Sequence, residues 1–121
     1  MATTTLTDEN FQTAVTGGGI VLVDFWAPWC GPCRVFGPVF EQVSGAHPDV
    51  VFGKVDTQSQ PDLAAAAGIR SIPTLMVFRD GALVFSQPGA LPETALQELI
   101  AAVRALDMRE APDVITAPGR R

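Results

Sequence analysis

A run of apolar residues that is rich in β-branched side chains limits the fold of this chain most strongly. Residues 20–26 read IVLVDFW, and Asp24 is the one charged side chain among them. Such a nearly continuous run is typical of a central strand that is covered on both faces. Because apolar residues stand on each side of Asp24, we expect its carboxyl group to be buried, and burial raises the pKa of a carboxyl group.

Helices and further strands are expected on both sides of this run. The sequence predicts helices at residues 8–15, 32–46, 61–67 and 92–106, and strands at 50–56, 74–78 and 82–86. Thr7 is the expected cap of the first helix, and Pro38 should bend the second. Strand, helix and strand in succession imply a parallel pair, whereas Asp80-Gly81 between the last two strands predicts an antiparallel hairpin. The pattern indicates an α/β protein.

Length and charge narrow the classes of protein further. A chain of 121 residues suffices for one hydrophobic core, and residues 107–121 lack apolar periodicity, so we expect one domain with a mobile C-terminal tail. The net charge of -5 argues against nucleic acid as a partner. The N-terminus lacks the pattern of a secretory signal, and no apolar run approaches the roughly 20 residues that span a bilayer. We therefore expect a cytoplasmic protein without a membrane partner.

Cys30 and Cys33 stand at the expected start of the second helix. A bridge across so short a loop removes little entropy from the unfolded chain, which favours a chemical over a structural role. Cys30 should be exposed beside the positive end of the helix dipole, where a thiolate is stabilised, and Cys33 should be more shielded in the first turn. Gly31 and Pro32 shape the turn, and proline at a helix start loses no hydrogen bond.

Paired cysteines also bind zinc and iron–sulfur clusters, which need about four ligands. His47 is the only histidine and the chain has no third cysteine, so we expect no metal site and a solvated His47 in a loop. The chain contains no G-x-G-x-x-G pattern, and we expect it to carry no cofactor of its own.

Two motifs resemble the thioredoxin family. Residues 23–34, VDFWAPWCGPCR, are similar to its active-site signature, and residues 69–75, IRSIPTL, are similar to its substrate loop. The similarity runs from about residue 6 to residue 106, although Ala67 stands where an aromatic residue is common and the chain has no tyrosine. The resemblance implies a thioredoxin fold, with a central mixed five-stranded sheet flanked by four helices, a first strand at 3–6 and a domain over 1–106.

The resemblance also implies roles for individual residues. Cys30 would attack a substrate disulfide, and Cys33 would resolve the mixed disulfide. Asp24 matches the family's buried carboxylate and is a candidate to accept the proton of Cys33. Lys54 would stabilise the charged form of Asp24, or would be an ordinary solvated lysine. The substrate-docking residues implied are an exposed Trp29, Ile72, Pro73 with a cis peptide bond, and Gly89, while Trp26 is expected in the core.

The function implied is that of a protein-disulfide reductase. It would act through dithiol–disulfide exchange, as part of electron transport and cell redox homeostasis. Its partners would be disulfide-containing substrate proteins and a thioredoxin reductase, and we expect a monomer. Two alternatives are a non-enzymatic subunit or chaperone module with the same fold, and an oxidase or isomerase of an oxidising compartment. Gly31 and Pro32 between the cysteines, and an N-terminus without the pattern of a secretory signal, favour a disulfide reductase over an oxidase or isomerase.

Overall fold

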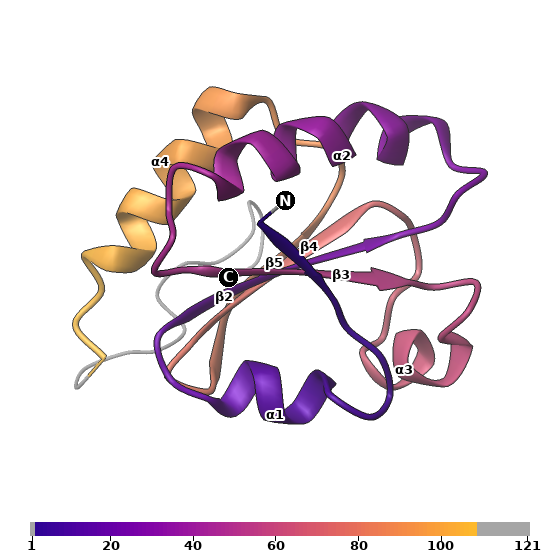
Figure 1. Cartoon of the computed structure of the whole chain (residues 1–121), viewed down its shortest axis with the longest axis horizontal. Helices are drawn as coiled ribbons and strands as arrows, with labels where there is room; N and C mark the ends of the chain where they lie inside the picture. Colours follow the sequence, from indigo (N-terminus) through magenta and orange to yellow (C-terminus); the bar gives the residue numbers. More distant parts are fainter. Residues whose placement is uncertain (1, 109–121) are drawn as a thin grey trace.

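A mixed sheet with helices on both faces forms the protein (Figure 1). The computed structural model describes residues 2–108. In chain order the elements are β1 Thr3–Thr5, α1 Phe11–Thr16, β2 Ile20–Trp26, α2 Gly31–Ser44, β3 Val51–Asp56, α3 Pro61–Ala66, β4 Thr74–Arg79, β5 Ala82–Pro88 and α4 Glu93–Arg104. The strand order is β1-β3-β2-β4-β5, with β1, β3 and β2 mutually parallel and β4 antiparallel to both its neighbours. This confirms the mixed five-stranded sheet with four helices, and β2 as its central strand.

The sheet separates two apolar clusters. In Figure 1, α2 and α4 cover one face, and α1 and α3 cover the other. Leu22 packs with Phe40 of α2 in the first cluster, whereas Val21 and Val23 belong to the second. Because successive side chains of a strand point to opposite faces, Asp24 shares the α2 face with Leu22. The charged residue of the central strand is therefore directed to the side on which the cysteine-bearing helix lies.

The first helix begins three residues later than predicted. Residues 8–10 form a turn, and α1 starts at Phe11. Thr7 still caps this turn, since its Oγ1 accepts a hydrogen bond from the Glu9 N–H at 3.3 Å. Asn10 donates to the Thr5 carbonyl at 3.2 Å and accepts from the Thr7 N–H at 2.7 Å. These side-chain bonds compete with regular helix at the N-terminus.

His47 lies in a loop, as predicted, but it is half-buried, so the prediction that it is solvated is only partly right. Its ring stacks on Phe52 with the centroids 6.4 Å apart, and its Nε2 lies 2.8 Å from Gln97 Oε1. Arg104 Nη2 lies 3.1 Å from Nδ1. Because a guanidinium group only donates, Nδ1 accepts this bond and Nε2–H donates to Gln97. The partners belong to α4, which the local sequence around His47 does not reveal.

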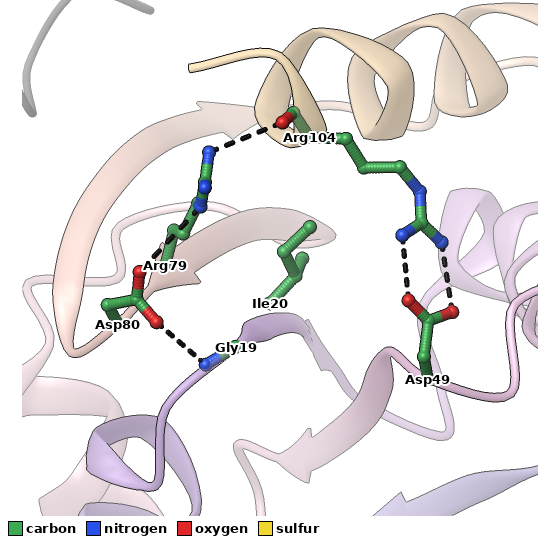
Figure 2. Close-up of a pocket in the computed structure, with 6 residues that line it drawn as sticks. All are labelled: Gly19, Ile20, Asp49, Arg79, Asp80 and Arg104. Atoms are coloured by element: carbon green, nitrogen blue, oxygen red, sulfur yellow. Dashed lines mark hydrogen bonds and ion pairs between the residues drawn. The ribbon is translucent and has the colours of Figure 1, made fainter. Parts of the chain in front are cut away.

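Two arginines join α4 to the sheet at the end where β2 begins (Figure 2). Arg79 Nη1 donates to the carbonyl oxygens of Val103 and Leu106 at 2.8 and 2.7 Å. Arg104 makes two hydrogen bonds to the Asp49 carboxylate, at 2.7 and 3.0 Å. Both arginines line a hollow of about 280 Å³. β2 begins at this hollow and ends next to the cysteines. The hollow therefore lies at the end of the sheet that is away from Cys30 and Cys33.

The core extends slightly beyond α4. Leu106 and Met108 are half-buried and pack on the cluster beneath α2 and α4. The tail predicted at 107–121 falls almost entirely outside the described residues, because the structure describes only Asp107 and Met108 of it.

Two truncations test where the domain ends. We expect removal of residues 109–121 to leave the melting temperature unchanged, because their sequence has no periodic apolar face. Removal of residues 106–121 should lower it by several degrees, since about 1 kcal/mol corresponds to about 4–8 °C in a domain of this size. That deletion removes the packing of Leu106 and a carbonyl acceptor of Arg79. Thermal unfolding followed by circular dichroism measures the melting temperatures of both truncated proteins. An equal fall in melting temperature for the two truncations would contradict a domain boundary after Leu106.

Candidate active site

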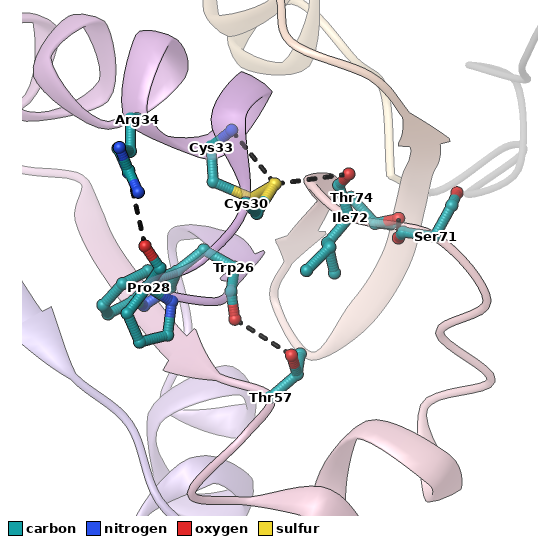
Figure 3. The surroundings of a disulfide bond; sticks show 9 residues. All are labelled: Trp26, Pro28, Cys30, Cys33, Arg34, Thr57, Ser71, Ile72 and Thr74. Carbon is teal, nitrogen blue, oxygen red and sulfur yellow. Dashed lines mark hydrogen bonds between the residues drawn. A yellow bond between two sulfur atoms is a disulfide. The ribbon is translucent and has the colours of Figure 1, made fainter.

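The two cysteines lie where the end of β2, the start of α2 and the loop before β4 meet. A disulfide bond joins Cys30 to Cys33, and their Cα atoms are 5.2 Å apart. Ile72, which precedes β4, lies beside this bond (Figure 3), with its carbonyl oxygen 3.7 Å from Cys30 Sγ. The antiparallel register of β2 and β4 pairs Phe25 with Thr74 and so brings this loop to the cysteines.

The start of α2 is arranged to stabilise negative charge on Cys30. Cys30 is the N-cap residue, and its Sγ accepts a hydrogen bond from the Cys33 N–H at 3.2 Å. Pro32 occupies the first turn, as predicted, where its missing N–H costs no hydrogen bond. The N–H of Cys33 and the positive end of the helix dipole are therefore both directed toward Cys30 Sγ. The geometry therefore favours Cys30 as the nucleophile.

Both cysteines are buried, so the prediction of an exposed Cys30 is wrong. Each has 4% of its surface exposed, and they cluster with Ala27, Trp26 and Ile72. The sequence around Cys30 does not reveal this burial, because Ile72, which packs beside Cys30, lies 42 residues later in the chain. Trp29 is 66% exposed, as predicted. Hydrogen bonding and helix position, rather than exposure, thus distinguish the two sulfur atoms.

Asp24 is fully buried, which confirms the prediction from the apolar residues around it. Neither carboxyl oxygen has a hydrogen-bond partner among the described residues. Burial raises the pKa of Asp24 to about 7, and the charge of Lys54 opposes this rise in part. Near neutral pH this carboxyl group therefore exists in both protonation states.

Lys54 is half-buried on the neighbouring strand, directly opposite Asp24 in the register of β2 and β3. Its Nζ lies 4.8 Å from the centroid of the Trp26 ring, a cation–π arrangement. Trp26 is itself half-buried, so the prediction of a core aromatic is confirmed only in part. Lys54 thus makes a cation–π contact with Trp26 and acts electrostatically on Asp24, which disfavours the alternative of an ordinary solvated lysine.

The predicted docking residues surround the disulfide. The Ile72–Pro73 bond is cis, as predicted, and the Gly89 N–H donates to the Pro73 carbonyl at 2.8 Å. Gly89 has φ 108°, a conformation that favours glycine. Trp29 and Ile72 share the lining of a hollow of about 210 Å³. The structure therefore gathers Trp29, Ile72, Pro73 and Gly89 at one end of the sheet.

Sequence reasoning missed two residues that brace this site. Thr57 holds the Trp26 carbonyl with its N–H at 2.8 Å and its hydroxyl at 3.0 Å. Arg34 Nε donates to the Pro28 carbonyl at 3.3 Å, and both bracing contacts are visible in Figure 3. Arg34 is the last residue of the motif at 23–34, so the sequence already places it next to the cysteines. Thr57 has no sequence signal, because its role depends on β3 ending beside β2.

Residues 2–108 contain no group of three or more histidine, cysteine, aspartate or glutamate side chains placed to hold a metal ion. Nor does any helix in this part of the chain have the length and apolar character needed to cross a membrane.

Comparisons with known proteins agree with this geometry. The Thioredoxin family model matches residues 2–102. The "Putative thioredoxin 2" of Streptomyces coelicolor is 60% identical over 109 residues, which cover 90% of this chain and 81% of that protein. The thioredoxin of Alicyclobacillus acidocaldarius is 47% identical over 103 residues, which cover 84% of this chain and 98% of that one.

A solved structure shares the fold as well. The Malassezia sympodialis thioredoxin aligns with a TM-score of 0.71 at 39% identity, covering 83% of this chain and 89% of its own. The family match, the relatives and the Cys30–Cys33 pair together favour an enzyme over a non-enzymatic module. The chain belongs to the thioredoxin family and is a thiol-disulfide reductase.

Proposed function

We propose that Cys30 is the attacking and Cys33 the resolving cysteine. The Cys30 thiolate attacks one sulfur of a substrate disulfide, forms a mixed disulfide and releases the other substrate sulfur as a thiolate. The Cys33 thiolate then attacks Cys30 Sγ, closes the Cys30–Cys33 bond and releases the second substrate thiolate. The hydrogen bond from the Cys33 N–H to Cys30 Sγ, at 3.2 Å, carries this assignment.

Asp24 has the proposed role of proton acceptor for Cys33. Cys33 must lose its proton before it attacks, and Asp24 is directed to the face of the sheet that α2 covers. Its pKa of about 7 lets the carboxylate take up a proton at neutral pH and release it afterwards. Lys54 has the role of limiting the rise of that pKa.

Substrate binding falls to the backbone of the loop before β4. An extended substrate segment would pair with the backbone of Ile72 in an antiparallel way, which requires little recognition of side chains. Trp29, whose apolar side chain is exposed, lines the same hollow as Ile72. Pro73 and Gly89 hold the loop through their backbone hydrogen bond.

The proposed electron donor is a thioredoxin reductase that draws electrons from a nicotinamide cofactor. Each turnover leaves the Cys30–Cys33 disulfide, and two electrons with two protons are needed to restore the dithiol. We place this cycle in the cytoplasm, as a monomeric carrier of electrons to substrate proteins. The net charge of -5 agrees with partners other than nucleic acid.

Insulin reduction tests the proposal. With dithiothreitol as electron donor, the parent protein should accelerate insulin reduction, and Cys30→Ser should abolish the acceleration because the attacking sulfur is gone. Repeating the assay with thioredoxin reductase and its nicotinamide cofactor tests the proposed donor separately. Full activity of Cys30→Ser would overturn the assignment of Cys30 as the attacking cysteine. If the parent protein reduced insulin with dithiothreitol but not with thioredoxin reductase, the disulfide chemistry would stand and the proposed electron donor would be wrong.

A further inference from the structure

An uncharged strip runs from the disulfide along the outer face of α2. Its members are exposed: Trp29, Gly31, Pro32, Val35 and Pro38, hereafter the α2 strip. Val35 is 69% exposed and Trp29 is 66% exposed, more than any other large hydrophobic residue described. Both lie within five residues of Cys30 in the sequence, so the two most exposed large hydrophobic residues of the described chain flank the cysteine pair.

Helix geometry aligns the strip. The buried side chains of α2 are Cys33, Phe36, Phe40, Val43 and Ser44, which face the sheet. Gly31, Val35 and Pro38 are spaced by four and three residues and lie together on the opposite face. With about 1.5 Å of rise per residue, this stretch extends about 10 Å from the start of the helix. Gln42, the next position on that face, is polar and ends the strip.

The guanidinium group of Arg34 is held away from the strip. Arg34 precedes Val35, but its Nε donates to the carbonyl of Pro28 at 3.3 Å, which folds the guanidinium group back over the loop before Cys30 (Figure 3). The members of the strip are themselves uncharged, and Arg34 does not place its charge beside Val35. A single exposed valine needs no explanation, whereas an apolar strip that continues from a reacting disulfide resembles an interaction surface.

We propose that the α2 strip is a second substrate-binding surface, and that Val35 determines specificity for substrates with an apolar residue near the attacked cysteine. This inference rests on the disulfide reductase activity. Its occupant is the polypeptide of the substrate, because the strip is continuous with the site where the mixed disulfide forms. The hollow between Trp29 and Ile72 then holds one flank of the substrate, and Val35 and Pro38, at the far end of the strip, contact the other.

Val35→Ser tests this inference. Replacement at so exposed a helix position leaves the fold intact, and serine and valine have similar helix propensities. We expect kcat/KM for insulin to fall about five-fold, as follows from the loss of one to two apolar groups from a contact. The rate with dithiobis-nitrobenzoate, a small disulfide without a polypeptide that could lie along the strip, should stay unchanged. Val35→Leu, which keeps an apolar side chain, should retain the insulin rate.

Leu83→Ser is the matched control. Leu83 is 46% exposed on β5, where it pairs with Phe78, toward the end of β4 away from Thr74 and the cysteines. Its insulin rate should equal that of the parent. An unchanged insulin rate in Val35→Ser, an equal loss with the small disulfide, or an equal loss in Leu83→Ser would overturn the inference. Failure of the parent itself to reduce insulin would instead overturn the reductase function.

Discussion

The Cys33→Ser variant is expected to trap its substrates as covalent adducts. The substitution leaves the attacking sulfur of Cys30 in place and removes the sulfur that would expel the substrate. The mixed disulfide therefore persists, and turnover of insulin should fall to the rate of dithiothreitol alone. Non-reducing gels measure the adducts, which should disappear when a reductant is added.

The Cys30→Ser variant is the control for this experiment. Serine at position 30 cannot form a disulfide, so no mixed disulfide should accumulate at that residue. Cys33 lies inside the first turn of α2 and its N–H donates to Cys30 Sγ, so its own sulfur lacks the N-cap position and is poorly placed to replace Cys30. Adducts in Cys30→Ser together with none in Cys33→Ser would reverse the proposed roles.

Asp24→Asn is expected to stabilise the protein at alkaline pH while slowing its turnover. The pKa of Asp24 is about 7 in the folded protein, against 3.8 as the ordinary value. The folded state therefore holds a proton that the unfolded state has lost, and stability falls as pH rises from about 4 to about 7. The shift of the Asp24 pKa corresponds to a free-energy cost of about 4 kcal/mol for burying the charged carboxylate. The asparagine amide would also be buried without a hydrogen-bond partner, so the substitution removes only part of that cost.

Denaturant unfolding at two pH values measures the effect on stability. At about pH 8 we expect the free energy of unfolding of Asp24→Asn to exceed that of the parent by about 2 kcal/mol, and near pH 4 the advantage should vanish. Parent turnover should rise with pH through about 7 as the carboxylate forms, and the variant should be at least about ten-fold slower there without that rise. Identical turnover profiles would remove Asp24 from the mechanism.

Local patterns predicted the elements of the fold closely, because apolar periodicity and turn residues act over short distances. Residues 20–26 form the predicted central strand, and Asp80 and Gly81 form the turn between β4 and β5. The start of α1 was wrong because Asn10 bonds back to Thr5 and Thr7. The burial of Asp24 followed from its immediate neighbours, which already marked the strand as covered on both faces.

The sequence by itself determined the central strand, the cysteine pair at a helix start and a carboxyl group buried among apolar residues. Only the tertiary structure decided what surrounds them. Ile72 covers Cys30 from the loop before β4, and α4 partners His47, so Cys30 is less exposed and His47 less solvated than their local sequences indicate. Hydrophobic periodicity reports which face of an element is buried, whereas the contacts of a side chain depend on elements brought together from distant parts of the chain.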